Sequence, residues 1–105
     1  MNEKDPATIR TATFGLIVEY DGTDFHGSQL QANARTVQGE LERALAAIMG
    51  RRTRVRLASR TDAGVHATAQ VAVFEAQTRL GADSLRKALN HHLPEDIRVR
   101  CAQTA

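Results

Sequence analysis

Four segments of the chain alternate apolar and polar side chains with the two-residue period of a β-strand. They cover residues 14–20, 54–58, 70–75 and 97–101. In the first segment, Ile17 lies on the face opposite to four apolar or aromatic side chains, those of Phe14, Leu16, Val18 and Tyr20. The last segment alternates Ile97, Val99 and Cys101 with arginines, so we expect Cys101 to be a small buried side chain.

Two further segments repeat apolar residues every three or four positions, which is typical of amphipathic helices. The first follows Thr36, a favoured N-cap residue, and ends before Gly50, which suits the end of a helix. The second runs from Gly81 to His92, with Asp83 or Ser84 as its cap. The order of elements along the chain is therefore β-α-β-β-α-β.

This order predicts an α+β fold with a ferredoxin-like arrangement, a four-stranded antiparallel sheet with both helices on one face. We expect residues 1–12 to be a loose lead-in and residues 13–105 to form one domain. The strands at 54–58 and 97–101 are expected at the two edges of the sheet.

The face of the sheet without helices would carry Ile17 and Phe74 among arginines, a surface suited to RNA or to a partner protein domain. The arginines of this face are Arg54, Arg56, Arg98 and Arg100. The net charge is only +2, and on charge alone a solvated face is the commoner explanation of such a cluster. Charge therefore permits nucleic-acid binding without requiring it.

The composition, with 42% hydrophobic and 25% charged residues, is that of an ordinary globular domain. No apolar run is long enough to span a bilayer, and the first residues lack the apolar stretch of a signal peptide. We therefore expect a cytoplasmic protein with no membrane partner. The single cysteine excludes an internal disulfide, which agrees with a reducing compartment.

The segment "SRTDAGVHAT", residues 59–68, is longer than a connection between two strands requires. Asp62-Ala63-Gly64 alone is a common turn signal, but a turn requires neither Arg60 nor His66. A nearby arginine favours the ionised form of a carboxylate, and an ionised aspartate can act as a nucleophile or as a general base. Spacing alone does not choose between these two roles.

The segment "YDGTDFHGSQLQ", residues 20–31, is a second polar loop, which could also be a flexible turn. Both loops follow strands that we expect to be neighbours in the sheet, although this does not oblige them to converge at one end.

Four motifs occur in order along the chain: "EYDGTDFHGSQLQ", "TVQGELERAL", "RTDAGVHA" and "LNHHLPEDIRV". Together they resemble the N-terminal half of the bacterial tRNA pseudouridine synthase A family over residues 14–99. Two positions depart from the family pattern. Ser28 stands where a tryptophan usually packs the loop, and Ser59 stands where a glycine usually allows close approach. Neither departure removes the aspartate.

The resemblance implies isomerisation of uridine to pseudouridine in the anticodon stem-loop of tRNA, with no metal and no organic cofactor. It gives Asp62 the role of the catalytic aspartate, which forms a covalent adduct with the target nucleotide on either the base or the ribose. Arg60 would pair with this aspartate and help to displace the base. We expect the substrate-binding residues in both loops: Arg60, Thr61, Gly64, His66, Tyr20, Asp21 and Gln29.

Members of this family are longer than the chain, and their active cleft lies between two halves. We therefore expect the chain to be an N-terminal fragment that folds, is inactive alone and forms a homodimer through its exposed strand edges.

Two other functions stay open. One is a non-catalytic ferredoxin-like RNA-binding or dimerisation module, although the base-stacking aromatics of such modules would be represented by Phe74 alone. The other is a metal-binding domain that uses histidines, which is weak because their spacing does not resemble a zinc site. These histidines are His26, His66, His91 and His92.

Overall fold

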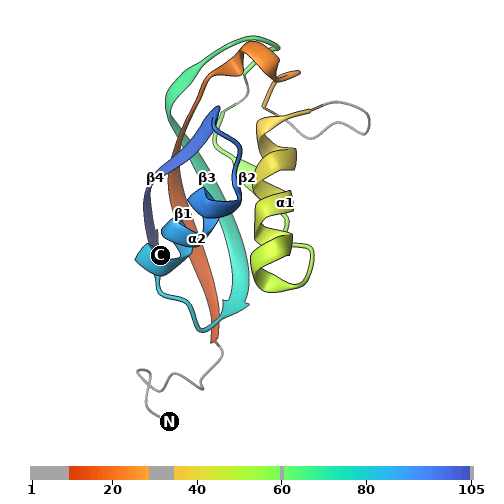
Figure 1. The fold of residues 1–105 in the computed structure, drawn as a ribbon. Coiled ribbons are helices and arrows are strands. Elements are labelled where there is room, and N and C mark those ends of the chain that lie inside the picture. The colour runs from red at the N-terminus through yellow and green to blue at the C-terminus, as the bar shows by residue number, and fades with distance from the viewer. Residues whose placement is uncertain (1–9, 29–34, 60, 105) are drawn as a thin grey trace.

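The computed structural model describes residues 10–28, 35–59 and 61–104. Its elements follow the order β-α-β-β-α-β, with a short 3₁₀ turn after the first strand (Figure 1). They are β1 (Arg10–Tyr20), η1 (Gly22–Asp24), α1 (Val37–Met49), β2 (Arg56–Leu57), β3 (Ala67–Thr78), α2 (Ala82–His92) and β4 (Ile97–Thr104). The order expected from the sequence is confirmed.

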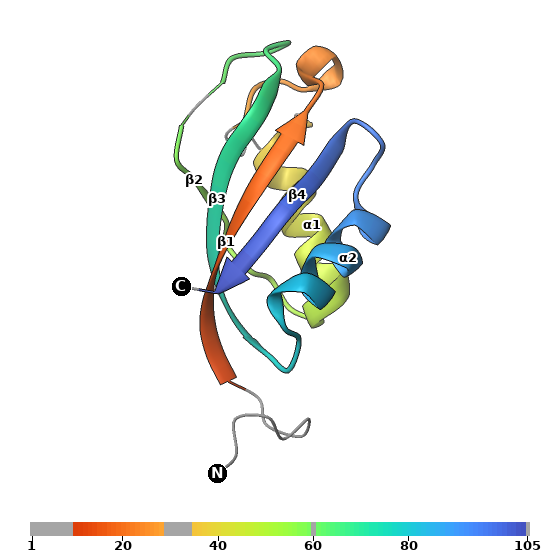
Figure 2. The same cartoon turned by 90° about the vertical axis from the view of Figure 1, so that its left-hand side faces the viewer.

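The four strands form one antiparallel sheet in the order β2-β3-β1-β4. Both helices lie on the same face of this sheet, as two views at right angles show (Figures 1 and 2). The expected α+β arrangement is therefore confirmed, with β2 and β4 at the two edges.

The strand boundaries differ from the expected ones. β1 begins at Arg10, inside the segment expected to be a lead-in, because residues from Arg10 onward pair with the end of β3. β2 has only two residues, and the residue before it is held by α1 instead of by the sheet. Val55 N donates to Glu42 Oε2 at 2.9 Å, and Gln38 Nε2 donates to Val55 O at 3.0 Å. Side chains of α1 thus replace part of the expected strand pairing.

An apolar layer fills the space between the helices and the sheet. The expected inner face of β1 is confirmed, since its four large side chains are all buried. The expectation that Phe74 lies on the opposite face is wrong. Phe74 is 2% exposed, lies opposite Phe14 in the strand pairing and stacks on it with the ring centroids 5.4 Å apart. The outer face of β3 carries Val71 and Val73 instead.

The expectation that Cys101 is buried is also wrong, because this cysteine is exposed. β4 contains a β-bulge: Val99 pairs with Val18 and Cys101 pairs with Ile17, which leaves Arg100 as an extra residue. The extra residue reverses the alternation, so Cys101 shares the outer face with Ile17.

The two helices begin in different ways. The expected N-cap of α1 is confirmed, since Thr36 Oγ1 accepts a hydrogen bond from Gly39 N at 3.1 Å. The N-cap of α2 is Gly81, without a side-chain cap, so the expectation of Asp83 or Ser84 is wrong. Asp83 lies in the first turn, where its carboxylate forms ion pairs with basic residues further along the helix.

Candidate active site

Two polar loops meet at one end of the sheet. Loop A comprises residues 21–28, and loop B comprises residues 58–66 except Arg60, which lies outside the described residues. The strands that precede them, β1 and β2, are not neighbours, because β3 lies between them, so that expectation is wrong. The loops meet because loop B leads into β3, whose first residue, Ala67, pairs with Tyr20 at the end of β1.

Three hydrogen bonds tie Thr61 of loop B to loop A and to β1. Ser28 N donates to Thr61 O at 3.0 Å, and Thr61 N donates to Ser28 Oγ at 2.8 Å. The hydroxyl groups of Thr61 and Tyr20 form the third bond at 2.7 Å. The amide, the carbonyl and the hydroxyl of Thr61 are all engaged.

Asp62 follows Thr61 directly and is exposed. Its carbonyl accepts a hydrogen bond from Val65 N at 3.2 Å, which closes a tight turn. Gly64 in this turn has a φ of 81°, a left-handed conformation that glycine adopts without strain, and its amide donates to Phe25 O at 3.2 Å. The backbone is therefore fixed on both sides of Asp62, while the residue itself reaches solvent.

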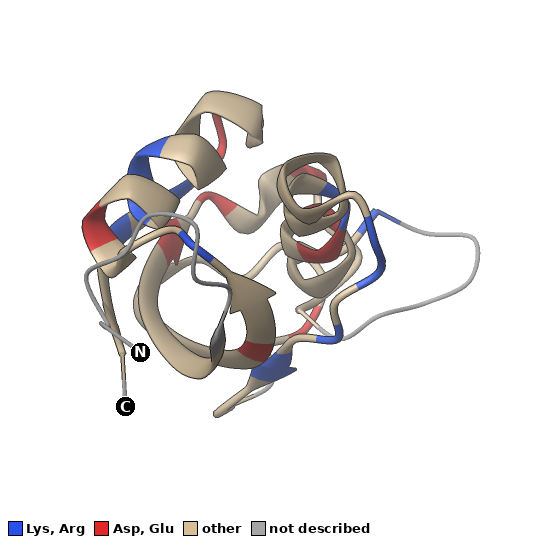
Figure 3. Cartoon of the chain, turned by 90° about the horizontal axis from the view of Figure 1, so that it is seen from below, with Lys and Arg blue, Asp and Glu red and all other residues tan. Residues whose placement is uncertain are grey.

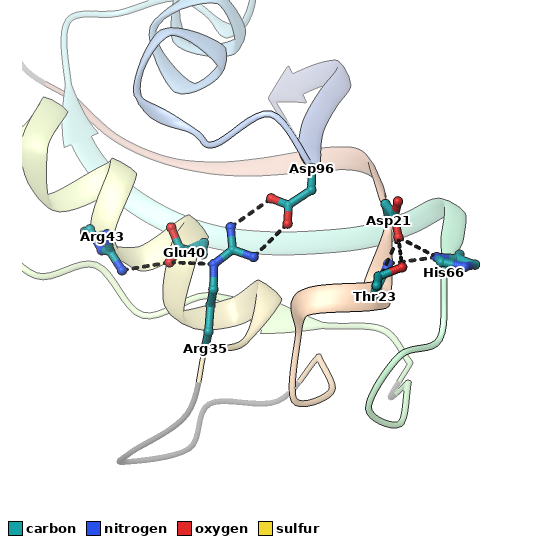
Figure 4. Close-up of polar contacts among 8 residues, drawn as sticks. Asp21, Thr23, Arg35, Glu40, Arg43, His66 and Asp96 are labelled. Carbon is teal, nitrogen blue, oxygen red and sulfur yellow. Dashed lines mark hydrogen bonds and ion pairs between the residues drawn. The ribbon is translucent and has the colours of Figure 1, made fainter.

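Loop A contacts loop B again at Gly22. A Cβ atom there would lie 1.9 Å from the carbonyl oxygen of Val65, so the observed approach requires glycine. Gly22 N donates to His66 Nδ1 at 2.8 Å. His66 Nδ1 also lies 3.1 Å from Asp21 Oδ1 (Figure 4). One ring nitrogen cannot accept from Gly22 and donate to Asp21 at once, so these two contacts of His66 are alternatives.

The carboxylate of Asp21 is stabilised in its ionised form. Asp21 Oδ1 accepts hydrogen bonds from Thr23 Oγ1 at 2.6 Å and from Thr23 N at 3.0 Å (Figure 4). These bonds, the hydroxyl first, lower the pKa of Asp21, and the nearby His66 adds a smaller contribution in the same direction. Asp21 is thus a fixed negative charge at the junction of the two loops.

Arg35 connects loop A to the segment before β4. Its guanidinium donates to both carboxylate oxygens of Asp96, at 2.7 and 2.8 Å (Figure 4). It also lies over the ring of Phe25, 4.2 Å from the centroid. The hydrogen bonds from Arg35 lower the pKa of Asp96, and the same contact raises the pKa of Arg35. Because Asp96 O accepts from Asp21 N at 2.9 Å, this ion pair braces loop A.

An open pocket of about 480 Å³ adjoins the two loops where β1 ends and where β3 and β4 begin. Its lining includes Asp21, His66, Asp96 and Arg98. Asp62 does not line it, so the pocket and the exposed carboxylate are separate features of this surface.

The structure brings together most of the residues expected at the site: Tyr20, Asp21, Thr61, Asp62, Gly64 and His66. Arg60 and Gln29 lie outside the described residues. No pattern in the sequence marks Ser28 as a contact between the loops, and none singles out Arg35 or Asp96. The one sequence signal at Ser28 is its departure from the family pattern, whereas Arg35 and Asp96 resemble ordinary surface charges in the sequence.

A family model described as tRNA pseudouridine synthase matches residues 16–105. The chain belongs to the tRNA pseudouridine synthase family. It is 51% identical to the tRNA pseudouridine synthase A of Syntrophomonas wolfei over 84 residues, which is 80% of this chain and 34% of the relative. The identity to the enzyme of the same name from Thermosipho melanesiensis is 53% over 90 residues, 85% of this chain and 37% of the relative. The chain spans about a third of the length of the curated relatives that it matches.

Two further observations bear on the alternatives. No helix within the described ranges is long and apolar enough to cross a membrane. In residues 10–28, 35–59 and 61–104, no group of three or more His, Cys, Asp or Glu side chains is placed to hold a metal ion.

Proposed function

We propose that this chain carries the catalytic aspartate of a tRNA pseudouridine synthase, Asp62, which forms a covalent adduct with the target nucleotide. The supporting observation is a fixed backbone beneath an exposed carboxylate, since hydrogen bonds hold Thr61 on one side and Val65 on the other. A nucleophile must be held in place and be accessible to the substrate at the same time. Membership of the family supplies the chemistry that such an aspartate would perform.

Isomerisation of uridine breaks the bond between N1 and the ribose C1′ and forms a bond between C5 and C1′. The hydrogen on C5 passes to solvent and N1 gains a proton, so the reaction consumes no oxidant or reductant. We therefore propose that Asp62 acts with neither a metal nor an organic cofactor. Attack of Asp62 on the base and attack on the ribose are both compatible with these bond and proton changes.

We propose tRNA as the substrate, bound across the face of the sheet that carries no helices. Arg56 lies opposite Val73 and Arg98 lies opposite Glu19 in the strand pairing, and both arginines are exposed. Basic residues also follow α1 through the segment that leads into β2, whereas α2 carries both signs (Figure 3). Arginine binds phosphate through its planar fork, so these positions suit an RNA backbone. Arg60 would occupy the space of the displaced base.

The test uses a chimera in which the matched residues of this chain replace the 84 equivalent residues of the Syntrophomonas wolfei enzyme. Release of tritium from tRNA labelled at uridine C5 measures turnover. Asp62→Asn keeps the shape of the side chain without its anionic oxygen and should lower turnover by about 10³-fold or more. The control is Asp24→Asn, an exposed aspartate of loop A, which should retain nearly full activity.

Comparable turnover by the Asp62→Asn chimera would remove this residue from the nucleophilic role. We expect the 105-residue chain alone to fold and to release no tritium above background, because the family's cleft needs a second wall. Multiple turnover by the chain alone would show that this wall is not required.

We also propose that the 105-residue chain self-associates as a two-fold dimer through an edge of its sheet. In the described sheet, β4 spans eight residues and pairs with β1 on one side only. An edge of this length can recruit another strand, and two-fold pairing is the commonest closed assembly. Sedimentation at about micromolar concentration should show a dimer. A monomer across that range would mean that the exposed arginines of β4 protect the edge.

A further inference from the structure

Ser28 of loop A is completely buried, and its polar groups are engaged. Its amide donates to Thr61 O at 3.0 Å, its hydroxyl accepts from Thr61 N at 2.8 Å, and its carbonyl accepts from Gln38 N at 2.9 Å. Burial of a hydroxyl is costly unless the hydroxyl is hydrogen-bonded, and here the bond is short and well placed. Ser28 therefore links loop A by hydrogen bonds to loop B and to α1.

The two bonds between Ser28 and Thr61 form a closed pair. They hold both the amide and the carbonyl of Thr61, as a paired residue of an antiparallel sheet is held, but a hydroxyl replaces one backbone carbonyl. Asp62 follows through a planar peptide bond, so fixing Thr61 O also fixes the plane that contains the Asp62 amide. The direction in which the Asp62 side chain leaves the backbone thus depends on Ser28.

The opposite side of Ser28 is anchored in a rigid element. Gln38 is the second residue of α1, where backbone amides have no partner within the helix. Ser28 O satisfies this amide, and α1 is held in turn by Leu41 and Leu45, which are fully buried in the apolar layer. A continuous series of contacts therefore runs from the packed helix through Ser28 to Thr61.

We propose that Ser28 is a positioning residue for Asp62, because its hydroxyl and its amide together hold Thr61 on both sides of the backbone and thereby aim the exposed carboxylate. The inference rests on the proposed function of Asp62, although Ser28 takes no part in the chemistry. Misplacing a reacting group by about 1 Å can lower a rate by about 10²-fold. Loss of the hydroxyl should therefore lower kcat and leave substrate binding largely unchanged.

The first measurement is amide hydrogen exchange in the unmodified 105-residue chain, which requires no activity. The Thr61 amide should exchange at least about 10-fold more slowly than the amide of exposed Ala63 in the same loop, because Ser28 Oγ accepts its hydrogen. In Ser28→Ala, the protection of Thr61 should fall by about 10-fold or more. Equal exchange at Thr61 and Ala63 in the unmodified chain would overturn the proposal even if the variant failed to fold.

The matched control is Thr36→Ala. Thr36 is also a buried hydroxyl that accepts a backbone amide, from Gly39 at 3.1 Å, but it has no contact with Thr61 among the hydrogen bonds of the described residues. Each variant loses one hydrogen bond between a buried hydroxyl and a backbone amide, that of Thr61 in Ser28→Ala and that of Gly39 in Thr36→Ala. Only Ser28→Ala should release the Thr61 amide.

The second measurement places both variants in the chimera. Ser28→Ala should lower kcat by about 10- to 100-fold with KM changed by less than about 2-fold. Thr36→Ala should keep kcat. An unchanged kcat in Ser28→Ala, with Thr61 released, would make Ser28 a structural contact only and overturn the proposal. If Asp62→Asn stays active, the proposed function fails, whereas the exchange result still stands by itself.

Discussion

The apolar layer between the helices and the sheet and the cluster formed by loops A and B are held together by different forces. In the layer, fully buried leucines of both helices pack with buried side chains of the sheet, and these leucines are Leu41, Leu45, Leu85 and Leu89. In the cluster, Tyr20 and Phe25 are the large side chains at the end of the apolar layer, and hydrogen bonds of 2.7 to 3.2 Å make the other connections between the loops.

This difference predicts different responses to substitution. Burial acts without direction and is shared among many contacts, so losing one side chain of the layer weakens the whole fold. A hydrogen bond depends on the placement of two atoms, so losing one in the cluster changes the position of a group. Substitutions in the layer should therefore appear in the free energy of unfolding, and substitutions in the cluster should appear in catalysis.

The largest effect on stability is expected in the layer. Leu45→Ala should lower the free energy of unfolding by about 2–5 kcal/mol, because it removes a fully buried side chain and leaves a void. Urea denaturation followed by circular dichroism measures this change. The control is Ala47→Lys at an exposed position of the same helix, which should change stability by less than about 0.5 kcal/mol. A loss below about 1 kcal/mol for Leu45→Ala would mean that the layer can collapse around the void.

The layer could be predicted from the sequence because its apolar residues repeat with the periods of strands and helices. The two side chains whose face is predicted wrongly, Phe74 and Cys101, have local explanations. β3 carries apolar residues on both faces, so alternation alone does not say whether Phe74 or its neighbours Val71 and Val73 face inward. The bulge at Arg100 shifts the alternation of β4 by one residue. No feature of the sequence marks this bulge, so the alternation predicts the wrong face for Cys101.

The cluster could be predicted only in part. The motif and the length of loop B singled out Asp62, but the partners that hold the loop have no periodic signal. Thr61 and Ser28 are 33 positions apart, and Arg35 and Asp96 are 61 positions apart. Polar atoms in loops meet because the strands around them meet, so these pairs become visible only when the sheet is known.

A smaller effect is expected at Arg35, which connects loop A to the segment before β4. The Arg35 side chain is about one third exposed, so solvent screening reduces the stabilisation that its ion pair with Asp96 provides. Arg35→Gln should lower the free energy of unfolding by about 1–2 kcal/mol, because it removes a two-bond ion pair and the contact with Phe25. The control is Lys87→Gln, which breaks an exposed ion pair with Asp83 and should cost less than about 0.5 kcal/mol.

The same variant gives a test against pH. Because Arg35 lowers the pKa of Asp96 in the folded protein, the pair stabilises the fold above the unfolded-state pKa of aspartate, about 3.9. The contribution disappears as the pH falls through the lower folded-state pKa. The stability difference between the unmodified chain and Arg35→Gln should therefore be full at pH 7 and shrink below about pH 4. A difference that grew on acidification would contradict the ion pair.

The smallest effect is expected at Thr36, where the layer and the cluster meet. Thr36→Ala removes the N-cap bond of α1 and should lower the free energy of unfolding by about 1 kcal/mol, whereas Thr36→Ser keeps the hydroxyl and should lose only a few tenths. Thermal unfolding measures both variants. Because the cap stabilises the helix without a hydrogen bond to Thr61 in the part of the chain that the structure describes, the lost stability should come with no loss of kcat in the chimera. A fall in kcat as large as that of Ser28→Ala would show that any weakening of α1 displaces Asp62, and the layer and the cluster would then respond as one unit.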